Sequence, residues 1–213
     1  MKFPFFASFL IFILVLQHNM RRNKKSHEQE ETAFWHRESS ANDVRKQSLE
    51  DLHYVTFQAQ PFYPLTLLDA AACTEFLDRN PEAKDMISRF LFLENQTMVN
   101  LTEFTNTDLK FKYGVANLNT LTEYDTNYNE LITLLHNYGT LFAKDGYETQ
   151  SLTILEYAVS IGSDISATYT TCAEIYLKNN MPEKFDWLKK EAEKISTSRK
   201  TPIINKLNSL DPA

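Results

Sequence analysis

Five histidines and two cysteines are the residues of this chain best suited to chemistry, and their positions do not assemble a reactive site. No histidine stands at the spacing of a metal-binding pair or beside a candidate nucleophile. His136 lies next to the apolar face of a helical pattern, which favours a half-buried packing role over that of a general base. Four scattered glycines cannot form a glycine-rich loop around a phosphate. The sequence therefore predicts no enzyme, and no bound cofactor, metal ion or small-molecule substrate.

Composition narrows the class of protein further. Cys73 and Cys172 are too few for a disulfide framework or a zinc site, and their apolar helical surroundings favour buried free thiols. A formal net charge of −6 gives no electrostatic reason to expect a nucleic-acid partner. Only 4 Gly and 7 Pro interrupt 213 residues, and alternating strand patterns are scarce, so the composition favours an all-α fold.

The chain opens with an uninterrupted apolar run over residues 3–16, followed by a basic cluster at residues 21–25. As a helix this run rises about 21 Å, somewhat less than a hydrocarbon core of roughly 30 Å. No small residues suited to signal cleavage follow it. Our interpretation is a single-pass transmembrane anchor, residues 1–19, that contacts the lipid bilayer through residues 3–16 of a cell-membrane protein. A soluble protein that starts at Met20 is the alternative.

The charges that flank the apolar run predict the topology of the chain. Because the basic cluster follows the run, the C-terminal domain is expected in the cytoplasm, with an extracytoplasmic domain as the alternative. Residues 20–51 are polar and dense in charge, which predicts a juxtamembrane linker. Residues 52–213 then carry helical patterns to the end of the chain. A long one runs from Leu121 to Phe142 and closes at Gly146.

Two parts of this helical domain can be laid on each other, with Tyr138 on Cys172 and Gly139 on Ala173. In both copies the order is an apolar residue, a small residue, an aromatic residue and then a residue that tolerates a left-handed helix end. The small residue lets a neighbouring helix approach, and the aromatic side chain fills the groove beside it. The positions predicted to pack the helices together are Tyr138, Gly139, Phe142, Gly146, Ala158, Cys172, Ala173, Tyr176 and Ala192.

These copies resemble the tetratricopeptide repeat, whose period matches the shift between them. The resemblance covers about residues 132–195, with repeat units at about 132–165 and 166–199. Ser151 and Phe185 stand where the family prefers alanine, and no proline ends either unit. Two units are fewer than a stable stack needs, so the preceding helices must act as a degenerate third unit or a cap. With its anchor, the chain looks like the anchored tetratricopeptide-like proteins of Gram-positive bacteria.

The resemblance implies a fold and a mode of action. The fold would be a short right-handed superhelix of antiparallel helix pairs, all-α, after the single N-terminal transmembrane helix. The first helix of each pair would line a surface that binds a protein or peptide partner, as in a membrane-anchored adaptor or scaffold. A structural subunit of a membrane assembly and an enzyme with an unrecognised site are the alternatives. The predicted partner contacts are Asn137, Thr140, Leu141, Thr170, Glu174 and Leu177.

Overall fold

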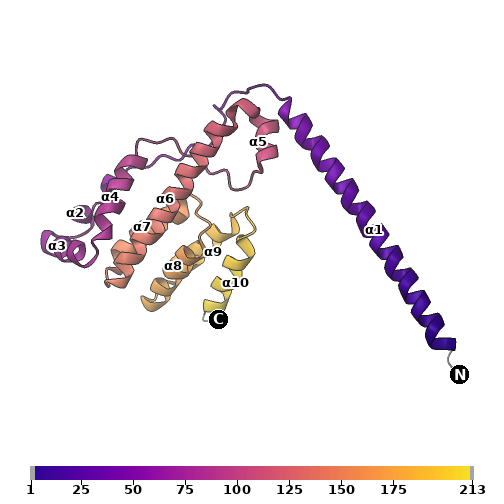
Figure 1. Cartoon of the computed structure of the whole chain (residues 1–213). Helices are drawn as coiled ribbons and strands as arrows, with labels where there is room; N and C mark the ends of the chain where they lie inside the picture. The colour runs from indigo at the N-terminus through magenta and orange to yellow at the C-terminus, as the bar shows by residue number, and fades with distance from the viewer. Residues whose placement is uncertain (1–2, 212–213) are drawn as a thin grey trace. The chain divides into compact units, whose positions relative to one another are not determined.

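A computed structural model describes residues 3–211, and the regular elements in that range are all helices (Figure 1). The all-α prediction is therefore confirmed for these residues. The chain forms two compact units, residues 1–48 with 105–118 and residues 49–104 with 119–213. The helices are α1 (Phe3–Asn42), η1 (Gln60–Phe62), α2 (Pro64–Leu67), α3 (Ala70–Arg79), α4 (Glu82–Leu93), α5 (Asn106–Tyr113), η2 (Val115–Asn117), α6 (Leu118–Lys144), α7 (Glu148–Ser160), α8 (Ser166–Lys178), α9 (Pro182–Glu193) and α10 (Lys200–Leu210).

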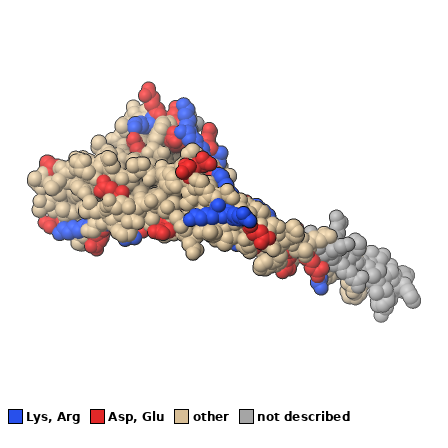
Figure 2. Space-filling view, turned by 90° about the horizontal axis from the view of Figure 1, so that it is seen from above, with Lys and Arg blue, Asp and Glu red and all other residues tan. Residues whose placement is uncertain are grey.

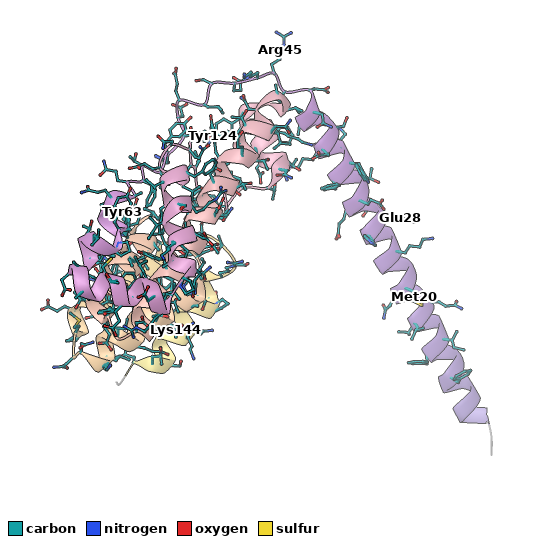
Figure 3. All side chains as sticks on the ribbon, turned by 60° about the vertical axis from the view of Figure 1, so that its left-hand side comes forward. Met20, Glu28, Arg45, Tyr63, Tyr124 and Lys144 are labelled. Atoms are coloured by element: carbon teal, nitrogen blue, oxygen red, sulfur yellow. The ribbon has the colours of Figure 1, made fainter. Side chains whose placement is uncertain are left out.

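The first unit joins the end of α1 to α5. Ala41 of α1 is fully buried. One carboxylate oxygen of Glu38 accepts a hydrogen bond from the Thr107 hydroxyl at 2.7 Å, and the other pairs with the Lys110 ammonium. These contacts explain why residues 105–118 belong to the same unit as α1, although the sequence suggested a continuous domain over residues 52–213. Upstream of this contact the side chains of Met20 and Glu28 are exposed on α1 (Figure 3).

The prediction of a transmembrane helix is wrong. Within residues 3–211 no helix is apolar over a stretch long enough to cross a membrane. Although α1 has 40 residues, its apolar run ends at Leu16 and polar residues follow at once, so the apolar part is too short. The helix α1 continues through residue 19, where the sequence predicts that an anchor (1–19) passes into a linker (20–51). Residues 1–2 and 212–213 lie outside the described range.

In the second unit, α3 and α4 pack against α6 through aromatic side chains. The rings of Phe76 and Phe142 stack with their centroids 4.2 Å apart, and the rings of Phe90 and Tyr138 form a T-shaped pair with centroids 5.4 Å apart. The Tyr138 hydroxyl donates a hydrogen bond to the carbonyl of Phe62 at 3.0 Å, which satisfies its polar atom inside the core. These contacts bury one side of α6 and fix its position in the unit.

The helices α6 to α10 follow one another as neighbouring rods (Figure 1). The turn after α6 and the turn after α8 are closed by the same hydrogen bond, at corresponding positions of the two sequence copies. The Tyr147 N–H donates to the Phe142 carbonyl, and the Met181 N–H donates to the Tyr176 carbonyl, both at 2.9 Å. These are the 6→1 bonds of a Schellman helix end. The turn after α7 is closed in the same way, by the Ser163 N–H and the Ala158 carbonyl at 3.0 Å, so the three turns from α6 to α9 share one helix-end geometry.

The last helix, α10, packs against both α8 and α9. Ile203 and Leu207 of α10 are buried in the core that α7, α8 and α9 share. The opposite side of α10 carries exposed polar residues, among them Asn205 and Asn208. This arrangement covers the apolar side of the second helix pair, as the end of a helical stack requires.

Candidate binding surface on α6 and α8

One side of α6 stays at the surface along most of the helix. Tyr124 lies near the start of α6, and Lys144 ends it (Figure 3). Between them a shallow hollow of about 560 Å³ follows the helix. The floor includes the half-buried Leu134, and the other positions are mostly small and polar. The residues that line this α6 hollow are Thr126, Asn129, Glu130, Thr133, Leu134 and Asn137.

The hydrogen bonds of these side chains determine what the α6 hollow offers. The Thr133 hydroxyl donates to the Asn129 carbonyl at 2.8 Å, one turn earlier in the helix. The Asn129 side-chain amide donates to the Asp125 carboxylate at 2.9 Å. The Asn137 side chain has no partner within residues 3–211. The hydroxyl protons of Thr126 and Thr133 and one amide proton of Asn129 are used inside the helix. The α6 hollow therefore offers acceptor oxygens on all of these side chains, together with the remaining amide protons of Asn129 and Asn137.

An ion pair neutralises the carboxylate that lines the hollow. The Arg89 guanidinium of α4 donates to the Glu130 carboxylate at 2.6 Å, and this hydrogen bond lowers the pKa of Glu130. The Arg89 guanidinium also lies 4.3 Å from the centroid of the Phe92 ring. On the face that Figure 2 shows, acidic and basic groups are interspersed and uncharged residues cover most of the area. Because Glu130 is paired with Arg89 and the other lining residues are uncharged, the α6 hollow offers neutral hydrogen-bonding groups.

His136 connects α6 to α8 beside this hollow. Its Nδ1 atom lies 3.1 Å from the hydroxyl oxygen of the buried Thr168. Burial lowers the pKa of His136, so the neutral imidazole is favoured. The half-buried position agrees with the packing role expected from the sequence. The contact also places α8 next to α6, so that the exposed Glu174 belongs to the neighbouring helix.

The predicted partner contacts differ in their accessibility. Asn137 and Glu174 are exposed. Thr140 and Thr170 are half-buried, and each hydroxyl donates to the carbonyl four residues earlier, at 2.8 and 3.1 Å. The two apolar residues among the predicted contacts belong to, or pack on, the hydrophobic cores of the second unit. Leu141 is only 8% exposed and belongs to the core beneath α6, and the half-buried Leu177 packs on the second core.

Leu141 therefore lies on the buried side of α6, away from the surface where the partner contact is predicted. The partner contacts predicted from the sequence did not include Thr126, Asn129 and Thr133, because these residues precede or only begin the repeated part of the sequence. A polar spacing of three, four and four residues through Asn137 is the signal that places them on one side of a helix. That spacing was hidden by the apolar pattern on the opposite side.

The positions predicted to pack the helices together lie where helices meet, with one exception. Gly146 is exposed in the turn after α6. At Gly139 the neighbouring helix α7 comes close, since an added Cβ would lie 2.5 Å from Leu155 Cδ2. The buried members of the set are Tyr138, Gly139, Phe142, Ala158, Cys172, Ala173, Tyr176 and Ala192.

Other reactive groups in the described range do not gather into a site. Cys73 and Cys172 are free and buried, and burial raises the pKa of both thiols. Over residues 3–211, no group of three or more His, Cys, Asp or Glu side chains is placed to hold a metal ion. A polar cavity of about 220 Å³ lies beside Asp164, whose carboxylate accepts hydrogen bonds from Thr197 at 3.1 Å and Arg199 at 3.3 Å. The buried carboxylate of Asp164 is therefore already paired.

Comparisons of the chain with models of protein families, with curated proteins and with solved structures find no match in any of the three.

Proposed function

We propose that this chain is a helical adaptor that binds a segment of a partner protein along the exposed side of α6, next to α8. The observation that carries the proposal is the α6 hollow, with a half-buried leucine in its floor and a neutral polar rim. A binding surface of this kind combines apolar contact with hydrogen bonds that fix orientation. The packing of α6 against α3 and α4 through aromatic rings, and against α7 at Gly139, supports a preformed surface, which lowers the entropic cost of binding.

The shape of the hollow favours a protein segment over a small molecule. Residues 126–137 cover about 17 Å of helix, at roughly 1.5 Å per residue. Small-molecule pockets enclose most of the ligand's surface, whereas the α6 hollow is lined entirely from one helix and stays open along it. About five residues of an extended peptide would span this length, at roughly 3.3 Å per residue.

The matching order of buried small and aromatic positions in the two sequence copies supports a tetratricopeptide-like organisation of the two helix pairs. Gly139 with Phe142 and Ala173 with Tyr176 are all buried. In such an organisation the first helix of each pair, α6 and α8, would carry the binding surface. Under this proposal Asn137 and Glu174 are partner contacts, and Leu141 supports α6 from below.

A selection of binding peptides tests this proposal. A library of random peptides displayed on phage is selected against the full chain, and the affinities of selected peptides are measured by fluorescence anisotropy. Asn137→Ala and Thr133→Val should each weaken binding about 3- to 10-fold, the usual effect of one hydrogen bond. Thr153→Val is the matched control, because Thr153 is also exposed and donates to the carbonyl four residues earlier, but on α7.

Circular dichroism of each variant checks that the helices stay folded. The adaptor proposal fails if the library yields no binding peptide. It also fails if every selected peptide binds Asn137→Ala and Thr133→Val as tightly as the unchanged chain, because binding would then lie elsewhere.

A further inference from the structure

We infer that the segment in the α6 hollow is an extended strand that donates its main-chain N–H groups to Asn129, Thr133 and Asn137. The inference rests on the proposed adaptor function, and it specifies the conformation and chemistry of the partner. Three observations carry it: the unused hydrogen-bonding capacity of these side chains, their spacing along α6, and the neutral charge of the hollow.

The first observation concerns acceptors. The Thr133 hydroxyl donates its proton to the main-chain carbonyl of Asn129, so the hydroxyl oxygen can only accept a further hydrogen bond. The side-chain amide of Asn129 donates one proton to the Asp125 carboxylate, and the side-chain oxygen of Asn129 remains free to accept a hydrogen bond. An extended peptide has main-chain N–H groups without internal partners, whereas in a helix the N–H groups beyond the first turn are already bonded. The three acceptor oxygens in a row on α6 therefore fit a strand better than a helix, and the unused amide protons of Asn129 and Asn137 can donate to main-chain carbonyls of the same strand.

The second observation is spacing. Asn129, Thr133 and Asn137 follow one another at four-residue intervals, which is about 6 Å along a helix axis. The N–H groups on one edge of an extended chain recur every second residue, about 6.6 Å apart. Over two intervals the difference is about 1 Å, which rotation of the side chains can absorb. One strand can thus meet all three acceptors in register.

The third observation is charge and polarity. The Glu130 carboxylate is paired with Arg89, so the hollow offers no free ionic partner to a charged side chain. Leu134, half-buried in the floor, offers apolar contact to a side chain of the strand. An uncharged strand bound through its main chain satisfies both features. Its affinity should depend little on salt, because no charge pair forms on binding.

N-methylation of a selected peptide tests the inference. Each main-chain N–H is replaced in turn by N–CH₃, which removes the donor and leaves the side chains unchanged. The expected result is an alternating pattern, in which every second methylation weakens binding about tenfold or more and the ones between have little effect. Thr133→Ser, which keeps the oxygen, should bind as the unchanged chain does, while Thr133→Val should not.

The outcomes separate this inference from the adaptor proposal. If selected peptides lose affinity for Asn137→Ala but the methylation series shows no alternation, the adaptor proposal stands and the extended strand is excluded. The strand is likewise excluded if a peptide becomes helical on binding, as seen by circular dichroism, or if raising the salt concentration abolishes binding. Alternation together with rescue by Thr133→Ser would establish main-chain recognition.

Discussion

Gly139 illustrates at the scale of one residue how packing constrains this chain. A Cβ at this position would lie 2.5 Å from Leu155 Cδ2 and 2.7 Å from Leu155 Cγ, so a larger side chain must displace α7 or its leucine. Overpacking costs about 1–3 kcal/mol. Gly139→Leu should therefore lower the melting temperature of the full chain by several degrees, measured by circular dichroism. Thr140→Ala, one residue on, should change it little. An unchanged melting temperature in Gly139→Leu would show that this is no packing position.

At Ser151, in contrast, a substitution should increase the stability of the fold. It is fully buried in α7, and its hydroxyl has no hydrogen-bond partner within the described residues. Burying a polar group without a partner costs about 1–3 kcal/mol. Ser151→Ala should raise the free energy of unfolding by about 1 kcal/mol in urea titrations.

Ser163 is the matched control for this substitution. It is also buried, but its hydroxyl oxygen accepts a hydrogen bond from the Ile165 N–H at 3.3 Å. Ser163→Ala should therefore lower the free energy of unfolding. Equal losses in the two variants would mean that the Ser151 hydroxyl is bonded after all.

At the scale of elements, the ends of α6 and α8 depend on a left-handed residue. Gly146 has φ of +84° and Asn180 has φ of +53°. No atom lies within 4 Å of an added Cβ at Gly146, so a substitution there is resisted by backbone strain and not by a clash. Gly146→Ala should lower the free energy of unfolding by about 1–2 kcal/mol. Gly146→Asn should lower it less, because asparagine tolerates this conformation. Similar losses in both would point to a lost contact instead.

The long helix α1 is also explained by local sequence. No proline occurs between Pro4 and Pro61, and the first glycine is Gly114, so the usual helix breakers are missing through Asn42. The sequence suggested a change of element near residue 19 because hydropathy changes there. Hydropathy decides what surrounds a helix, whereas the absence of helix breakers allows it to continue past such a change.

At the scale of the whole molecule, stability should depend on the protonation of His136. Burial lowers its pKa in the folded chain, so the unfolded chain takes up a proton at higher pH than the folded one. Stability is then greatest above the ordinary pKa of about 6.5 and falls as the pH drops through that value. Urea titrations at pH 8 and at pH 5.5 should give the lower free energy of unfolding at pH 5.5.

His136→Gln is the control for this pH dependence. The variant removes one of the five histidines and keeps a side chain that can bond to Thr168. Its free energy of unfolding should change less between the two pH values than that of the unchanged chain. An equal change in both proteins would assign the effect to other groups.

The sequence by itself determined the features that depend on residues close to one another along the chain. These are the helical class, the left-handed helix ends, the buried free thiols and the alternation of small and aromatic packing positions. Each depends on backbone propensity or on the helical period, which act within a few turns. The matching turns after α6 and α8 follow from the same local rules, since both use the same type of helix end.

Only the tertiary structure decided which surfaces are free. Leu141 has an apolar side chain in a helix with two buried sides, and only its packing shows that it faces the core. Glu38 contacts Thr107 and Lys110, which are remote from it in the sequence, and because of these contacts α5 belongs to the same compact unit as α1. The neutral charge of the α6 hollow likewise depends on Arg89 of α4, which pairs with Glu130. Such contacts join residues from distant parts of the chain, so no local pattern specifies them.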